Sequence, residues 1–183
     1  MFCFHFIYFV SLFGNHKLYS GSMTTKIELP KHLAEYLKGK FGNEENIVHL
    51  PASCSLYFIL YELLQRRPVE CPVDRGNVEI KLPSPRIAHQ PAGKPIASFN
   101  YVSQRGTLAL IKAINTMLKA EAHEFFDENK HIRGIDYIES AYAFLEKYGI
   151  ENLTAEALLK DYQRWRKKIG RKTVYRQRKN TKK

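Results

Sequence analysis

The sequence predicts a mostly α, α+β protein: a helical body with short strands or a hairpin, and a helix-turn-helix-like pair at its carboxyl end. Three observations lead there. Apolar residues recur with a helical period in the second half of the chain, three short extended segments each end in Leu-Pro, and prolines between residues 68 and 101 exclude a long helix. The 183 residues are 44% hydrophobic and 26% charged, which is typical of a globular protein. We expect one domain over residues 23–169.

Residues 1–22 are expected to lie outside this fold. The apolar run at their start has about 13 residues, fewer than the roughly 20 that a membrane-spanning helix needs. No basic residue precedes Lys17, no A-x-A-like cleavage site follows, and residues 19–22 are a weak cleavage candidate at best, so the main features of an export signal are missing. Globular patterning begins after Met23, and we expect that residue to be the natural start. A hydrophobic arm packed on the domain and a cleaved signal are the alternatives.

Two helices are expected in the first half of the domain, each after an extended segment. Leucine before proline favours extended backbone, and proline suits the first turn of a helix, so Pro30 and Pro51 predict helix starts. The first helix should stop near Gly39 or Gly42. The second is apolar on almost every side from residue 56 to 64, which predicts a central element of the core.

The proline-rich stretch that follows contains two strand-like segments, residues 78–82 and 96–102. We expect them to pair across the connection between them. One interpretation is an edge hairpin beside a surface loop. The other is a wing that contacts nucleic acid through nearby cations, namely Arg75, Lys81, Arg86 and Lys94.

Two helices are predicted next, over residues 107–129 and 135–148. Glu121 lies within the apolar stripe of the first, and a buried carboxylate is costly without a partner, so either the stripe is half exposed there or a cation meets Glu121. The second should end at Gly149. Its expected inner face consists of Ile135, Ile138, Ala141, Tyr142 and Leu145.

The last predicted helix, from Thr154 as N-cap to about Ile169, has two opposed faces. The apolar face, expected to pack on the body, contains Ala155, Leu158, Tyr162, Trp165 and Ile169. The cationic face contains Lys160, Arg164, Lys167, Lys168 and Arg171. We expect Tyr162 and Trp165 to hold the helix in place and residues 170–183 to form a basic, flexible tail.

The charge of the chain is concentrated in this helix and tail. Residues 160–183 contain twelve basic residues and one acidic residue, Asp161, which equals the whole net charge of +11, so the rest of the chain is balanced. This distribution predicts a polyanionic partner. The candidate nucleic-acid-binding residues are Lys160, Gln163, Arg164, Lys167, Lys168, Arg171, Lys172, Arg176, Arg178 and Lys179.

Residues 135–169 have the outline of a helix-turn-helix, although the connection between the helices is longer than usual. Lys160, Gln163 and Arg164 are the candidates for base contacts, because their side chains can form paired hydrogen bonds with base edges. We expect nucleic-acid binding, with DNA favoured over RNA. A helical hairpin with a solvated basic face, a module that docks an acidic protein, and an RNA-binding accessory protein are the alternatives.

The pattern Ile-Asp-Tyr-Ile-x3-Tyr-x-Phe-Leu-Glu-Lys-Tyr-x-Ile, followed by Leu-Leu-Lys-Asp-Tyr-Gln-Arg-Trp-Arg-Lys-Lys, covers residues 135–168. It resembles small uncharacterised proteins of bacterial phages and integrated mobile elements. The resemblance implies a DNA-associated role in such an element and supplies no catalytic residues.

The sequence offers little for catalysis or metal binding. His123 and Asp127 are four residues apart, but a third ligand and an HExxH motif are missing, so we expect a solvated polar face there. Phosphate-binding glycine motifs and GxSxG are absent too. Three cysteines without CxxC spacing favour a reducing compartment, the cytoplasm, and Cys54 and Cys71 are expected to be inert. We therefore expect no enzyme, no cofactor, no metal and no membrane partner.

Overall fold

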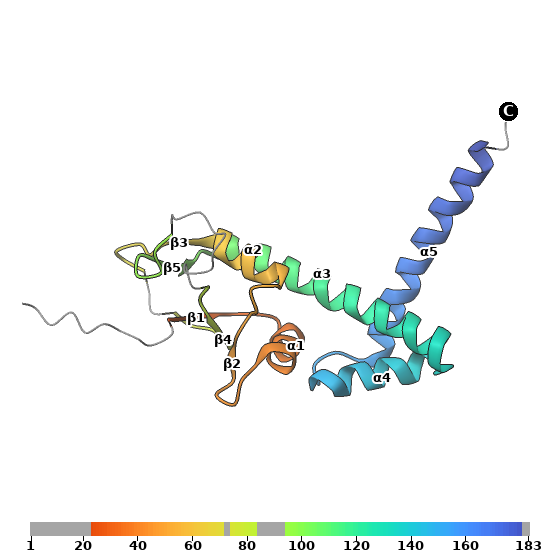
Figure 1. The fold of residues 1–183 in the computed structure, drawn as a ribbon, viewed down its shortest axis with the longest axis horizontal. Coiled ribbons are helices and arrows are strands. Elements are labelled where there is room, and N and C mark those ends of the chain that lie inside the picture. The colour runs from red at the N-terminus through yellow and green to blue at the C-terminus, as the bar shows by residue number, and fades with distance from the viewer. Residues whose placement is uncertain (1–22, 72–73, 84–93, 181–183) are drawn as a thin grey trace, which may run out of the picture.

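The computed structural model describes residues 23–71, 74–83 and 94–180, with side chains as far as residue 169. It is an α+β protein in which helices predominate, as predicted (Figure 1). Its elements are β1 (Thr24–Ile27), α1 (Lys31–Phe41), β2 (Ile47–Val48), α2 (Ser55–Leu63), β3 (Leu64–Arg66), β4 (Val78–Lys81), β5 (Phe99–Val102), α3 (Gln104–Glu128), the π-helical turn η1 (Asn129–Arg133), α4 (Tyr137–Tyr148) and α5 (Ala155–Asn180).

The long helix α3 connects two regions of the molecule. The strands and α2 lie around its first part, α4 and α5 pack around its second part, and α1 contacts both its second part and α4 (Figure 1). Ser103 caps its start, because the Ser103 hydroxyl accepts a hydrogen bond from the backbone N–H of Gly106. Its buried stripe includes Leu110, Ile114 and Leu118, which continues the core from one region into the other.

The strands form two small sheets whose pairing differs from the expected hairpin. β4 lies between β1, to which it is antiparallel, and β2, to which it is parallel. β5 pairs instead with β3, which follows α2 directly. The prediction that residues 78–82 pair with 96–102 is therefore wrong, because alternating side chains identify a strand but not its partner.

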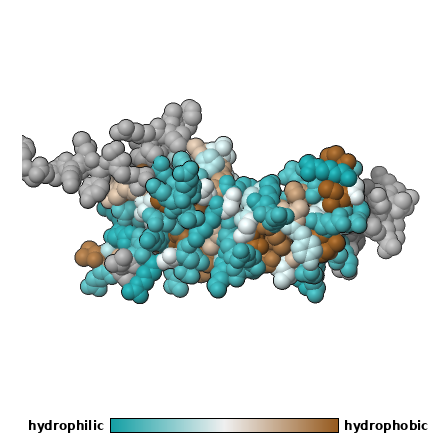
Figure 2. All heavy atoms as spheres, turned by 90° about the horizontal axis from the view of Figure 1, so that it is seen from below, coloured by the Kyte–Doolittle hydropathy of each residue, from teal (hydrophilic) through white to brown (hydrophobic). Residues whose placement is uncertain are grey.

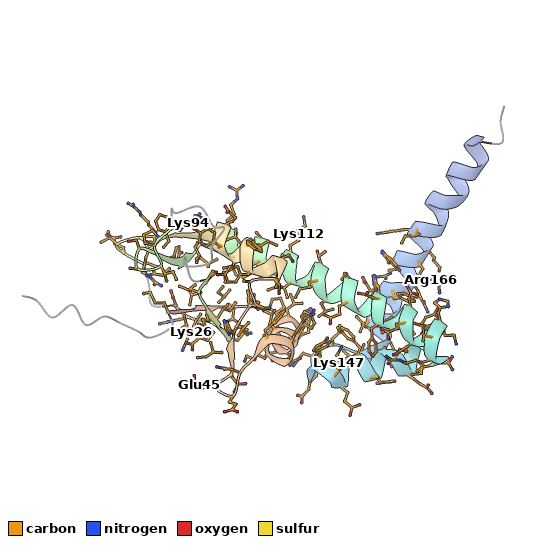
Figure 3. The ribbon with its side chains drawn as sticks, in the orientation of Figure 1. Lys26, Glu45, Lys94, Lys112, Lys147 and Arg166 are labelled. Atoms are coloured by element: carbon orange, nitrogen blue, oxygen red, sulfur yellow. The ribbon has the colours of Figure 1, made fainter. Side chains whose placement is uncertain are left out.

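The cations of the proposed wing are dispersed. The Nζ of Lys94 donates to the backbone carbonyls of Tyr61 and Glu62, at 3.0 and 2.7 Å, and so satisfies the carboxyl end of α2 (Figure 3). Arg75 is exposed and Lys81 is half-buried, while Arg86 lies outside the described residues.

Helices α1 and α2 follow the expected plan with one shift. Pro30 occupies the N-cap position of α1, and Gly42 ends that helix. α2 begins at Ser55, a turn later than the start predicted from Pro51. It belongs to the core, as predicted, with Leu56, Tyr57, Leu60 and Tyr61 buried.

Helix α4 faces the core with different residues from those predicted. Ala141 and Leu145 are buried, but Ile138 is at the surface and Tyr142 is 56% exposed. The buried face contains Ser140, Ala141, Phe144, Leu145 and Tyr148. Phe144 packs against Phe125 of α3 and Tyr148 against Tyr36 of α1, so two neighbouring helices set the rotation. Hydrophobic atoms are visible at the surface of the end that carries α4 (Figure 2).

Helix α5 begins as predicted and extends further. The Thr154 hydroxyl accepts a hydrogen bond from the backbone N–H of Ala157, which confirms the N-cap, and Gly149 ends α4 with a φ of 61°. The helix then continues to Asn180 instead of ending near Ile169, so residues 170–180 are helical where a flexible tail was predicted. The apolar period ends near Ile169, but the backbone of the helix continues beyond it.

Candidate nucleic-acid interface

Four cations of α5 form an exposed row that we call the basic ridge: Lys160, Arg164, Lys167 and Lys168. All four are exposed, as is Gln163 beside them. Among the residues that the structure describes, none of the four takes part in an ion pair. The structure therefore leaves the charge of this predicted face available to a partner.

The opposite side of α5 anchors the helix for its first two turns. Ala155, Leu158 and Tyr162 are buried. The Tyr162 hydroxyl donates to the carboxylate of Asp127 on α3, and its ring meets the Phe126 ring edge to face, with 5.2 Å between centroids. Burial, followed by this hydrogen bond to Asp127, raises the pKa of Tyr162, which keeps the hydroxyl protonated as a donor.

Beyond Tyr162 the apolar face is only partly covered. Trp165, expected to hold the helix, is 37% exposed but still contacts α3, whereas Ile169, expected to pack on the body, is exposed. Trp165 lies over the ring of His123, with 4.5 Å between centroids. The apolar face is only partly covered here because α5 leaves the body after it crosses α3 (Figure 1).

The remaining candidate residues continue along this helix. Their backbone lies within α5, and their side chains fall outside the described part of the chain. They are Arg171, Lys172, Arg176, Arg178 and Lys179. Arg166, which was not a candidate, donates to the hydroxyl of Tyr137 at 2.8 Å and lies over the Tyr137 and Tyr162 rings.

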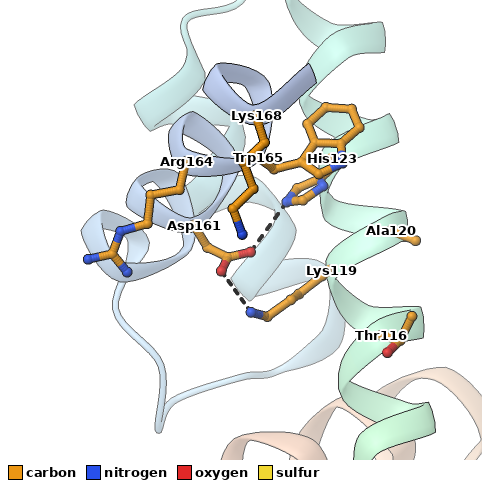
Figure 4. Close-up of a pocket in the computed structure, with 8 residues that line it drawn as sticks. All are labelled: Thr116, Lys119, Ala120, His123, Asp161, Arg164, Trp165 and Lys168. Atoms are coloured by element: carbon orange, nitrogen blue, oxygen red, sulfur yellow. Dashed lines mark hydrogen bonds and ion pairs between the residues drawn. The ribbon is translucent and has the colours of Figure 1, made fainter. Parts of the chain in front are cut away.

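A groove runs between α3 and α5 beside the ridge (Figure 4). Its volume is about 470 Å³, and it is lined by Thr116, Lys119, Ala120 and His123 of α3 and by Asp161, Arg164, Trp165 and Lys168 of α5. Lys119 thus joins two ridge cations at one site. Lys119 is not among the residues predicted from the sequence, because nothing in the spacing of α3 indicates where α5 crosses it.

Asp161 is shared by two groups on the floor of the groove. Its Oδ1 accepts a hydrogen bond from the Nζ of Lys119 at 2.7 Å, and its Oδ2 lies 3.4 Å from the Nε2 of His123 (Figure 4). That Nε2 is buried and makes no hydrogen bond within the described part of the chain. The two atoms are close, but they are too poorly aligned for a hydrogen bond.

His123 and Asp127 therefore do not form the solvated polar face that was predicted. His123 is only 7% exposed and Asp127 is half-buried. Both face α5, His123 toward Trp165 and Asp161, and Asp127 toward Tyr162. Burial lowers the pKa of His123, an effect that the charge of Asp161 opposes, so the imidazole is neutral at pH 7.

The arrangement is suited to binding an anion by charge. No group of three or more metal-ligating side chains occurs among the described residues. Within the same residues, no helix is both long and apolar enough to cross a bilayer.

No protein-family model matches the chain, and comparisons with curated proteins and with solved structures found no match.

Proposed function

We propose that the protein binds duplex DNA without catalysis, through the basic ridge and the continuation of α5. The observation that carries this proposal is a row of four exposed cations, which form no ion pair with any described residue, on a helix whose opposite side is buried in the body over its first two turns. Binding releases the counterions held by the phosphates, and each phosphate neutralised by lysine or arginine adds to the affinity.

The spacing of the ridge suits a phosphate backbone. Lys160, Arg164 and Lys168 are four residues apart, so they succeed one another at about one helical turn, roughly 6 Å along the axis. Lys167 lies beside the last of them. Each side chain can therefore reach a different phosphate while the body stays in one position.

The length of the helix favours DNA over RNA. α5 extends beyond the body as far as Asn180 (Figure 1), and a free helix fits the wide major groove of B-form DNA. The major groove of A-form RNA is too deep and narrow for side chains to read. Of the three predicted base contacts, the uncharged Gln163 is kept in this proposal, while Lys160 and Arg164 are assigned to phosphates.

The proposed setting agrees with the other features of the chain. Cys54 and Cys71 are free thiols, which suits the cytoplasm. The resemblance of residues 135–168 to proteins of phages and mobile elements agrees with a DNA-associated role there.

The test compares two variants of equal charge in the full chain. The ridge variant carries Lys160→Gln, Arg164→Gln, Lys167→Gln and Lys168→Gln. The control carries the same change at four exposed cations away from α5, namely Lys31, Arg75, Arg105 and Lys112. We expect the ridge variant to bind a short random-sequence duplex roughly a hundredfold more weakly, with a salt slope smaller by about 3.6 units, because four phosphate contacts are lost.

The control variant should keep most of the affinity and of the salt slope. Equal loss in both variants would mean that net charge alone drives binding and would overturn the proposal. Tighter binding to an RNA hairpin or to an acidic protein than to duplex DNA would also contradict it.

A further inference from the structure

The groove between α3 and α5 has the composition of an anion site. Arg164 and Lys168 line the wall formed by α5, and Lys119 lines the wall formed by α3 (Figure 4). Asp161 is the one acidic residue that lines this groove, and His123 beside it is neutral, so the described groove carries a net positive charge. Lys119 and Lys168 point toward Asp161, while the Arg164 guanidinium is turned outward at the edge of the groove (Figure 4). Two cations from two helices therefore converge as a bound phosphate requires, and Arg164 can add a third by turning inward.

Asp161 occupies the position that an anion would take at Lys119. The carboxylate accepts from the Nζ of Lys119 at 2.7 Å, as a phosphate oxygen would. The ion pair is half-exposed at the groove, where an incoming polyanion can compete with a single carboxylate.

His123, the second neighbour of Asp161, also supports displacement of the Asp161 carboxylate from Lys119. The Nε2 of His123 is buried, has no hydrogen-bond partner in the described structure, and lies 3.4 Å from Oδ2 of Asp161. Unpaired buried polar atoms are rare in proteins. A small rotation of the Asp161 side chain toward His123 would supply that partner and release Lys119.

We propose that this groove binds a backbone phosphate of the duplex, held by Lys119 together with Arg164 and Lys168, with Asp161 as the group displaced. The inference rests on the proposed function and adds α3 to the interface. The volume of about 470 Å³ leaves room for the sugar attached to the phosphate. Lys119 is then a binding residue that lies outside α5.

The first test isolates Lys119 from the ridge. Lys119→Gln should weaken binding of the random-sequence duplex about tenfold and lower the salt slope by about 1, the value for one phosphate contact. Lys119→Arg should keep both. The control is Lys112→Gln on the same helix, two turns away and exposed; it lies apart from α5 (Figure 3) and should change neither.

The second test is a substitution that should strengthen DNA binding instead of weakening it. Asp161→Asn removes the competing carboxylate, so it should tighten binding severalfold. If Asp161 only helped to hold α5 in place, the same change would weaken binding. In the background of Lys119→Gln the gain should vanish, because it depends on the released lysine, whereas a general effect of charge would persist.

The outcomes separate this inference from the proposed function. If Lys119→Gln matches wild type while the ridge variant loses binding, the groove is not a phosphate site and the ridge still is the interface. If Asp161→Asn tightens binding equally with and without Lys119, the groove proposal is overturned as well. If the ridge variant binds like wild type, the proposed function fails, and the groove proposal falls with it.

Discussion

Two carboxylates connect α3 to neighbouring helices, and their surroundings differ. Glu121 accepts hydrogen bonds from the hydroxyls of Tyr36 and Tyr148 and from the Nζ of Lys40. Asp161 accepts a hydrogen bond from Lys119 and has a neutral, poorly aligned histidine as its other neighbour. Glu121 thus accepts three hydrogen bonds, whereas Asp161 accepts one, from Lys119, and can still accept others.

The packing around each carboxylate follows the same division. The Nζ of Lys40 lies over the Tyr36, Phe41 and Tyr148 rings, and the two tyrosine rings meet edge to face at 5.3 Å. Asp161 instead lines a groove beside Arg164 and Lys168, which form no ion pair with any described residue. The same pairing of lysine with carboxylate therefore stabilises the fold at one place and leaves a binding surface at the other.

Hydrogen bonds keep Glu121 ionised and its tyrosine partners protonated. Burial alone would raise the pKa of Glu121, but the hydrogen bonds from Lys40, Tyr148 and Tyr36 outweigh it and lower the pKa. Burial and the hydrogen bond to Glu121 raise the pKa of Tyr148 to about 12. The cluster therefore holds one ionised acid and neutral donors at pH 7.

The largest effect on stability is expected from Glu121→Gln. The substitution removes the charge from three hydrogen bonds and leaves Lys40 without its ion partner, so the free energy of unfolding should fall by about 2–3 kcal/mol. Urea denaturation measures it. Glu124→Gln, one turn further along α3 and exposed, is the control and should change stability by less than about 0.5 kcal/mol. A loss no larger than the control's would show that the cluster does not stabilise the fold.

A smaller effect is expected from Asp161→Asn. The ion pair with Lys119 is half-exposed, and such pairs contribute roughly 0.2–1 kcal/mol. The same urea experiment should therefore give a loss below about 1 kcal/mol, even though the change alters DNA binding. A loss as large as that of Glu121→Gln would make Asp161 a structural residue and remove the contrast between the two sites.

The smallest effect concerns pH. Because burial lowers the pKa of His123, the unfolded chain, with an ordinary value of 6.5, takes up the proton first as the pH falls. Stability is therefore full above pH 6.5 and declines as the pH falls below it toward the lowered pKa. Urea denaturation between pH 7.5 and 5.5 should show a shallower decline for His123→Gln than for wild type.

His32 on α1 provides a second histidine for comparison. Burial lowers its pKa too, against the charge of Glu35, so it contributes a decline of the same sign. His32→Gln should remove its own share and leave that of His123. An unchanged slope in His123→Gln would mean that the imidazole is not held neutral beside Asp161.

Local features of the fold were predictable from the sequence. The N-cap at Thr154 and the end of α4 at Gly149 depend on residues within one turn, and both agree with the structure. For Glu121 the apolar stripe left two alternatives, partial exposure or a neighbouring cation. The structure has Lys40 there, and the sequence could not identify it because Lys40 lies on a helix far away in the chain.

Features set by more than one element were predicted wrongly. The buried face of α4 differs from the predicted one because Phe144 packs against α3 and Tyr148 against α1. The apolar pattern of α4 carries no information about those two neighbouring helices. The strands were paired with each other because they are consecutive strand-like segments, whereas the third strand, β3, directly follows a helix without a turn signal.

The sequence by itself determined the basic ridge, because side chains on one helix are arranged by the helical period and the charges of residues 160–183 are not balanced nearby. Only the tertiary structure decided that α5 crosses α3 at Lys119 and His123, since a crossing depends on the packing of both helices on a shared core. That crossing turns the one acid of the basic segment into the floor of a groove.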